Sequence, residues 1–165
     1  EPFKARANPM TLDIGLPVPA FSVASTGAAT ELTSAALMGK RYVLYFYPKD
    51  ATPGCTLEGQ QFRDLYAQFQ ALNCEILGVS RDTLKLHEKF RTTECFPFQL
   101  LSDGDERLCR LFDVIKTKNM YGKQVQGIER STFLVDEQGV LRQAWRKVKA
   151  DGHAAEVLQA LQSLA

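Results

Sequence analysis

The sequence predicts an α/β protein with a mixed central β-sheet flanked by helices. Strand and helix patterns alternate along most of the chain, and residues 41–47 and 76–79 are apolar on both faces, which is typical of parallel strands inside a sheet. Towards the C-terminus, two strand patterns flank the turn sequence DEQG, which indicates a hairpin, and a helix closes the chain. Together these patterns predict a layered α/β sandwich.

Apolar spacing defines the elements of the first half of the chain. Residues 19–24 and 30–32 have weak strand patterns, and the strong strand at 41–47 ends at Pro48, which cannot donate to a β-ladder. A helix follows to about residue 72, because five apolar side chains recur there on one stripe. They are Phe62, Leu65, Tyr66, Phe69 and Leu72.

In the second half the elements are shorter. After the strand at 76–79 we expect a helix from Leu84 to about Thr93, a strand at 98–101 and a helix at 106–112. The hairpin strands are expected at 131–135 and 140–148. Asp151 is a good N-cap for the last helix. That helix is expected to bury Val157, Leu158, Leu161 and Leu164.

Composition narrows the function classes. A hydrophobic share of 45% and a charged share of 24% are those of an ordinary globular protein. The net charge of +1, with basic and acidic residues interspersed, gives no electrostatic footprint for nucleic acid or an anionic membrane. The longest apolar run, residues 42–47, is too short to span a bilayer. We therefore expect neither a nucleic-acid partner nor a membrane.

Length predicts a single domain over residues 10–165. The N-terminal segment lacks the apolar core of an intact signal peptide. Met10 is a candidate natural start, in which case residues 1–9 are an added remnant or a flexible tail.

The four cysteines, Cys55, Cys74, Cys95 and Cys109, indicate reactive thiols rather than disulfide staples. The chain has enough apolar residues to fold without staples, and no two cysteines form a CxxC pair, which excludes a zinc ribbon or a thioredoxin-type dithiol. We expect a reducing compartment, the cytoplasm, with one or two reactive thiols.

Cys55 is the first candidate for such a thiol. It lies near the start of the predicted long helix, where Asp50 or Thr52 can cap and Pro53 suits the first turn. Free N–H groups and the positive end of the helix dipole favour an anion at this position. A thiolate is such an anion and is the nucleophilic form of cysteine. A buried structural cysteine is the alternative, but the strand-to-helix junction favours reactivity.

The segment PKDATPGC, residues 48–55, matches the peroxiredoxin signature Pro-x-x-x-Thr-x-x-Cys, and TPGCTLE resembles the bacterioferritin comigratory protein, or PrxQ, subfamily. The resemblance covers most of the chain. It extends through LGVSRD, LLSDGDE, KNMYGK, GIERSTFLVD and KVKADGHAAEVL, in that order. It implies a thioredoxin-like fold and thiol-dependent reduction of hydrogen peroxide and organic hydroperoxides, without metal, haem or flavin.

The resemblance also assigns roles to individual residues. It implies that Cys55 is the peroxidatic cysteine, that the Thr52 hydroxyl binds the thiolate and the peroxide, and that Pro48 shields the site from water. Arg130 matches the arginine that supports the thiolate and orients the peroxide, and Glu58 a glutamate that holds it. From the residues alone, Thr52 would be a helix cap, Pro48 a strand end, Arg130 a surface residue, and Glu58 a complement to the helix dipole.

These residue types suit thiolate attack on an O–O bond. The reaction needs an ionised sulfur and stabilisation of charge on the departing oxygen, and an arginine supplies a permanent charge with several fixed donors. The product on Cys55 is a sulfenic acid. Thioredoxin or a similar thiol is expected to recycle it, and the subfamily resemblance suggests a monomer. Two rivals are a thiol–disulfide oxidoreductase, disfavoured by the missing CxxC, and a redox-regulated holdase or sensor.

A second thiol can attack the sulfenic acid on Cys55 and form a disulfide with it; this resolving thiol is harder to assign. In many relatives it lies five positions after the peroxidatic cysteine, but that position here is Gln60. In others it lies in the helix after Leu84, at a position that aligns with Arg91. Cys95 is four residues further on, so we hypothesise that it resolves Cys55 after local unwinding of helix ends. A one-cysteine mechanism with an external thiol is the alternative. Cys74 and Cys109 are expected to be core thiols.

The two histidines are not expected to take part. His87 lies among Lys85, Glu88 and Lys89, which predicts a solvated helix face, and His153 lies in the first turn of the last helix. Neither has metal-ligand spacing with other donors, so no metal site is expected. Trp145 is compatible with the active-site mouth or with packing elsewhere.

Overall fold

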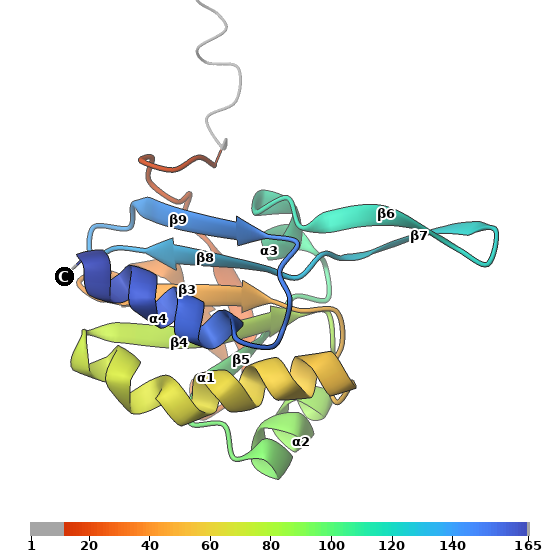
Figure 1. Ribbon diagram of the computed structural model, residues 1–165, viewed down its shortest axis with the longest axis horizontal. Helices are drawn as coiled ribbons and strands as arrows, with labels where there is room; N and C mark the ends of the chain where they lie inside the picture. The colour runs from red at the N-terminus through yellow and green to blue at the C-terminus, as the bar shows by residue number, and fades with distance from the viewer. Residues whose placement is uncertain (1–11, 165) are drawn as a thin grey trace, which may run out of the picture.

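A computed structural model describes residues 12–164. A seven-stranded sheet in the order β2-β1-β5-β4-β3-β8-β9 forms its centre, and β6 and β7 form a separate two-stranded ribbon (Figure 1). The strands are β1 (Ser22–Ser25), β2 (Glu31–Thr33), β3 (Arg41–Phe46), β4 (Cys74–Ser80), β5 (Gln99–Ser102), β6 (Ile115–Met120), β7 (Lys123–Ile128), β8 (Ser131–Val135) and β9 (Leu141–Arg146).

The sheet is mixed, as predicted. β3, β4 and β5 run parallel, whereas β8 pairs antiparallel with β3 and β9, and β1 pairs antiparallel with β5 and β2. β3 lies inside the sheet, between β4 and β8, and is buried on both faces, because its successive side chains enter two different hydrophobic clusters. Val43 and Tyr45 enter one cluster, and Tyr42, Leu44 and Phe46 enter the other.

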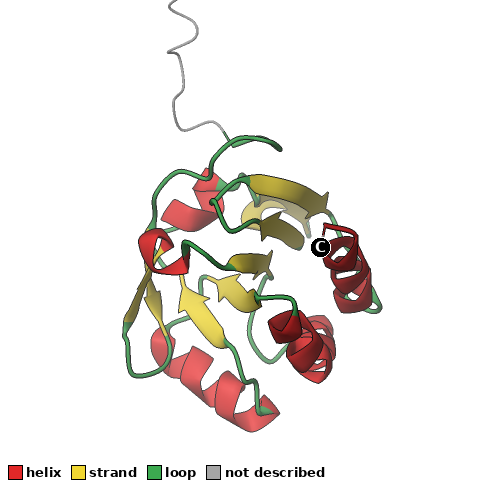
Figure 2. Cartoon of the chain, turned by 90° about the vertical axis from the view of Figure 1, so that its left-hand side faces the viewer, coloured by secondary structure: helices red, strands yellow, loops and turns green. Residues whose placement is uncertain are grey.

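Helices cover both faces of the sheet (Figure 2). α1 (Pro53–Ala71), α2 (Leu84–Glu94) and α4 (His153–Leu164) contribute to the cluster on the Tyr45 side. α3 (Arg107–Leu111) and the short 3-10 helix η2 (Ser34–Leu37) contribute to the cluster on the other side. No helix within residues 12–164 is long and apolar enough to cross a membrane.

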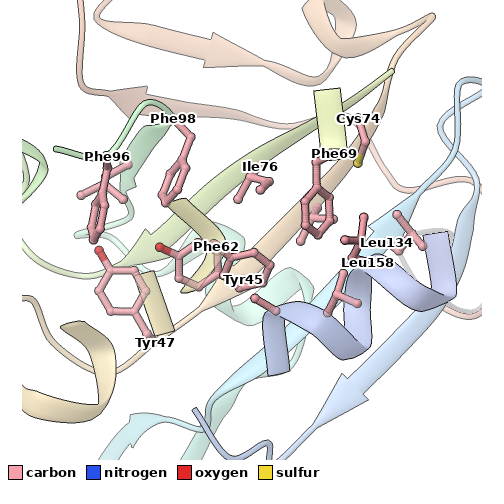
Figure 3. Packing of buried hydrophobic residues seen from close by; sticks show 14 of the residues in the cluster. Tyr45, Tyr47, Phe62, Phe69, Cys74, Ile76, Phe96, Phe98, Leu134 and Leu158 are labelled. Atoms are coloured by element: carbon pink, nitrogen blue, oxygen red, sulfur yellow. The ribbon is translucent and has the colours of Figure 1, made fainter. Parts of the chain in front are cut away.

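Aromatic packing fixes α1 against the sheet (Figure 3). The Tyr45 and Phe62 rings stack with their centroids 4.6 Å apart. Gly59 permits close approach to Phe96, because a Cβ at Gly59 would lie 2.3 Å from the Phe96 ring. The second turn of α1 is thus held against both the sheet and the segment that follows α2.

The predicted elements are confirmed with shifts of a few residues at their ends, and the DEQG hairpin is β8–β9. One expectation is wrong in detail: α4 begins at His153, and the Asp151 carboxylate instead accepts a hydrogen bond from Gln61 on α1. The β6–β7 ribbon and η2 were not predicted. The expectation about residues 1–9 concerns positions outside the described residues.

Candidate active site

The loop between β3 and α1 places Cys55 at the edge of the core. Thr52 is the N-cap residue and Pro53 the first residue of α1, so that Cys55 lies in the first helical turn. Only 2% of Cys55 is exposed. The sequence prediction for this helix start is confirmed, and Cys55 faces the protein interior beside the free N–H groups of the first turn.

Arg130 joins Cys55 to Glu58. Its Nη2 atom donates to Cys55 Sγ at 3.5 Å, and its Nη1 atom donates to Glu58 Oε1 at 2.6 Å. Cys55 and Glu58 are three residues apart, which places them on the same face of α1. Gly54 leaves room for the guanidinium, because a Cβ there would lie 3.2 Å from Arg130 Nη2. Three residues predicted from the sequence are therefore brought together.

Burial and charge oppose each other in this cluster. Burial raises the pKa of the fully buried Glu58 carboxyl to about 7, although the Arg130 charge acts to lower it. Burial also acts to lower the pKa of Arg130, but the negative charges of Glu58 and Cys55 outweigh that effect and raise it. Arg130 is thus held as a cation next to the sulfur.

Thr52 and Pro48 lie in the loop that leads into α1. The Thr52 hydroxyl donates to the Lys49 carbonyl at 2.8 Å, and its side chain makes no capping hydrogen bond to α1. Thr52 thus occupies the N-cap position as predicted, but the expected hydrogen bond from a backbone N–H of the first turn to its side chain is not formed. The oxygen of that hydroxyl retains its capacity to accept a hydrogen bond. Pro48 is exposed at the start of the loop.

A second polar cluster fixes the other side of the same loop. Asp50 accepts a hydrogen bond from the Tyr47 hydroxyl at 2.7 Å, and its other oxygen lies 2.6 Å from His87 Nδ1. His87 Nε2 lies 2.9 Å from the Leu101 carbonyl oxygen, which only accepts, so this nitrogen donates. The Asp50 backbone N–H donates to Asp82.

The prediction of a solvated face for His87 is wrong, because α2 turns this residue inward and buries it completely. Its three-residue spacing from Phe90, the other buried side chain of α2, was the available signal. Potential ligand atoms of Asp50, Asp82 and His87 lie within 4.8 Å of one another. Both ring nitrogens of His87 already have partners, however, so the cluster is complete without a metal ion.

His153 is also buried, between the last helix and the sheet. Its Nε2 atom lies 2.7 Å from the Thr132 hydroxyl and its Nδ1 atom 3.0 Å from Glu156. Burial lowers its pKa, and the Glu156 carboxylate opposes that shift. Trp145 packs edge-to-face against the His153 ring, with centroids 5.7 Å apart. His153 therefore has a packing role behind α1.

All four cysteines are free thiols, and their surroundings separate them. Burial raises the pKa of the Cys74 thiol to about 12, and it also raises the pKa of the Cys109 thiol. Both cysteines are therefore buried core thiols, as expected from the sequence. Cys95 is exposed and forms the C-cap of α2 in the left-handed conformation. Its neighbour Glu94 accepts hydrogen bonds from Gln60 and Arg63 of α1, so the end of α2 lies beside the second turn of α1.

Comparison with known proteins identifies relatives that all belong to one family. Residues 14–144 match the AhpC/TSA family. The chain is 57% identical over 139 residues to Peroxiredoxin Bcp of Xanthomonas campestris, covering 84% of this chain and 87% of the relative. It is 46% identical to Peroxiredoxin Bcp of Bacillus subtilis over 155 residues, covering 94% of this chain and 98% of the relative.

Solved structures agree with these matches. The structure of the Xanthomonas campestris Bacterioferritin Comigratory Protein, studied for its alkyl peroxide reduction activity, superimposes with a TM-score of 0.86 at 52% identity, over 92% of this chain and 99% of that chain. A mutant of PrxQ from Xylella fastidiosa gives a TM-score of 0.88 at 44% identity, over 93% and 97%. The predicted thioredoxin-like fold is thereby confirmed.

Proposed function

The chain belongs to the AhpC/TSA family and is a peroxiredoxin, a thiol-dependent peroxidase, and from this premise we propose that Cys55 is the thiol that attacks the peroxide. The observation that carries the proposal is the Arg130 guanidinium, which donates to both Cys55 Sγ and Glu58. No other cysteine within residues 12–164 has an arginine as a hydrogen-bond donor to its sulfur.

The proposed step is a displacement at oxygen. The Cys55 thiolate forms a bond to one peroxide oxygen, the O–O bond breaks, and the departing oxygen takes the electron pair and then a proton to become water or an alcohol. Cys55 is left as a sulfenic acid. Arg130 stabilises the thiolate and the charge on the departing oxygen, while Glu58 holds Arg130 in place. We assign the Thr52 hydroxyl to hydrogen-bond the peroxide and, in place of the Lys49 carbonyl, the Cys55 thiolate, and we assign Pro48 to exclude water.

We infer that organic hydroperoxides are substrates beside hydrogen peroxide. A cavity of about 290 Å³ opens next to the active-site loop, and Thr56 and the apolar Ala51, Leu86 and Phe90 line it together with charged side chains, among them Lys89 and Glu94. Apolar side chains there suit an alkyl group, and Thr56 is the neighbour of Cys55. The alkyl peroxide reduction activity of the Xanthomonas campestris protein supports the same substrate class.

We propose that Cys95 resolves the sulfenic acid. Its thiol attacks Cys55 Sγ, a disulfide forms, and the hydroxyl leaves as water. Cys95 is exposed at the end of α2, whereas Cys55 is buried in α1, so the step requires the helix ends to unwind until the two Cα atoms approach within about 7 Å. An external thiol that attacks Cys55 directly is the alternative.

Peptide mapping after oxidation by one equivalent of peroxide tests both assignments. We expect a Cys55–Cys95 cross-link in the wild type, and sulfenic acid that persists on Cys55 in Cys95→Ser. A dimedone-type probe should label nothing in Cys55→Ser, and the buried control Cys74→Ala should behave as the wild type. Full turnover of Cys95→Ser with thioredoxin, without an intramolecular disulfide in the wild type, would favour the one-cysteine mechanism.

The substrate is a peroxide and the electrons come from a thiol; we propose thioredoxin or a similar protein as their source. We further propose that residues 10–165 function as one monomeric domain in the cytoplasm. The four free cysteines favour a reducing compartment. Sedimentation of the reduced and oxidised protein tests the monomer.

A further inference from the structure

The β6–β7 ribbon projects from the body of the protein and pairs with no other strand of residues 12–164 (Figure 1). Residues that pair directly across an antiparallel ribbon share one face. The register pairs Met120 with Lys123 and Lys118 with Val125. The resulting cationic face consists of Lys116, Lys118, Met120, Lys123, Val125 and Gly127. All three lysines of the ribbon therefore lie on the same side.

The opposite face is uncharged. Its exposed side chains are polar amides and one hydroxyl, and Asn119 pairs directly with Gln124. This neutral face consists of Thr117, Asn119, Gln124 and Gln126. No Asp or Glu occurs between residues 115 and 128, although the whole chain has a net charge of only +1. The ribbon is thus a local concentration of positive charge with a defined orientation.

Two of the three ribbon lysines form no ion pair within the described part of the chain. Lys116 pairs with Asp113 at 3.3 Å, but no ion pair joins Lys118 or Lys123 to another side chain in the described part of the chain. Apolar groups lie among the charges: Met120 is 51% exposed, and Tyr121 at the tip is fully exposed. Exposed apolar side chains with unpaired lysines on one face are the composition of a surface for an acidic protein partner.

The position of the ribbon connects it to the active site. β7 ends at Ile128, two residues before Arg130. Figure 1 shows the ribbon extending from the end of the molecule at which β3 ends and α1 begins, the end that carries Cys55. A protein bound along the ribbon would therefore be held at the end of the molecule that carries Cys55.

We propose that the cationic face of the β6–β7 ribbon docks an acidic dithiol protein that returns electrons to the proposed Cys55–Cys95 disulfide. This inference rests on the proposed function and identifies its partner by charge. The dithiol supplies two electrons and two protons and becomes a disulfide itself, while the Cys55–Cys95 bond breaks and both thiols are restored. The cationic face has few charges interspersed with apolar groups, which fits a protein better than a densely charged polyanion such as nucleic acid.

A pair of variants with the same change in net charge tests the proposal. Lys118→Gln with Lys123→Gln removes two charges from the cationic face, and Asn119→Glu with Gln124→Glu adds two negative charges to the neutral face. With thioredoxin as the probe reductant, we expect the lysine variant to raise the KM for thioredoxin roughly 2- to 30-fold, as two partly screened charge pairs would. The KM of the neutral-face variant for thioredoxin should stay within about twofold of the wild-type value. Its new charges lie on the face that does not contact the partner, and the position of each charge decides its effect on binding.

Dithiothreitol provides the control, because a small neutral dithiol does not need the ribbon. Turnover with dithiothreitol should be equal in all three proteins. Equal KM increases in both variants, an unchanged KM in the lysine variant, or turnover with dithiothreitol but none with thioredoxin would each overturn the docking proposal. Lysine-dependent binding to phosphatidylglycerol vesicles, without an effect on thioredoxin, would also overturn it. Absence of turnover with either reductant would instead contradict the proposed peroxidase function.

Discussion

Two buried carboxylates, Asp50 in the loop between β3 and α1 and Glu58 in α1, differ in their partners. Both Asp50 oxygens have partners, the Tyr47 hydroxyl and His87. Glu58 has only Arg130, and within residues 12–164 its Oε2 atom has no hydrogen-bond partner. The Asp50 cluster contains no sulfur, whereas the cation of the Glu58 cluster also contacts Cys55.

The difference separates a structural cross-link from the proposed reactive site. A buried carboxylate with all partners supplied stabilises the elements that it joins, here the loop and α2. An incompletely paired carboxylate costs free energy on folding, and such groups cluster at functional sites. Because burial raises the pKa of Glu58 to about 7, the Glu58–Arg130 pair keeps its full charge only above neutral pH. The three predictions below test this separation.

The largest effect is expected from Arg130→Ala. The variant removes the donor to Cys55 Sγ and should reduce the rate constant of peroxide attack by about 10²–10³, which is typical for loss of one positioned electrostatic donor. Stopped-flow measurement of Cys55 oxidation gives the rate constant. Arg130→Lys keeps the charge but not the two-pronged geometry, so its rate should lie between those of Arg130→Ala and the wild type. An Arg130→Ala protein that is folded and reacts at the wild-type rate would contradict the role of the cluster.

The next effect concerns the dependence of stability on pH. The folded-state pKa of Glu58, about 7, lies above the ordinary glutamate value of 4.5, so the folded protein binds this proton more tightly than the unfolded chain. The resulting stability is fully present below about pH 4.5 and is lost as the pH rises through about 7, a change of about 3 kcal/mol. Urea unfolding at pH 5 and pH 8 measures it.

Glu58→Gln is the matched variant, because it keeps the shape of the side chain without the titration. Between pH 5 and pH 8 its stability should fall by about 2.5 kcal/mol less than that of the wild type. His153, whose pKa is lowered by burial, contributes a change of the opposite sign, but it contributes to both proteins and cancels in the difference. If the free energy of unfolding changed with pH in parallel for the two proteins, Glu58 would not be the group responsible for this pH dependence.

The sequence allows prediction of the reactive cluster better than of the structural one. Cys55 follows from local rules for a helix start, and Arg130 and Glu58 from the family resemblance, because all three belong to short motifs. His87 was misplaced, because its burial depends on how α2 packs against β5, which charged neighbours do not reveal. The β6–β7 ribbon was missed since its strands are polar and bury almost nothing.

The smallest catalytic effect is expected from His87→Leu, and it sharpens the comparison. Leucine fills the space but leaves Asp50 and the Leu101 carbonyl without their partner, which should reduce the free energy of unfolding by about 1–3 kcal/mol. The rate constant of peroxide attack should stay within about threefold of the wild-type value, since no atom of His87 contacts Cys55 or Arg130. Urea unfolding and stopped-flow oxidation of the same preparation give both numbers.

Asp50→Asn is the control for that variant. The asparagine oxygen can still accept from Tyr47 while its amide donates to a neutral His87, so both contacts survive without charge. Its loss of stability should therefore be smaller than that of His87→Leu. A folded His87→Leu protein whose rate of peroxide attack is reduced 100-fold would contradict this separation. The two clusters would then act as one catalytic network, because the loop would transmit the position of α2 to Cys55.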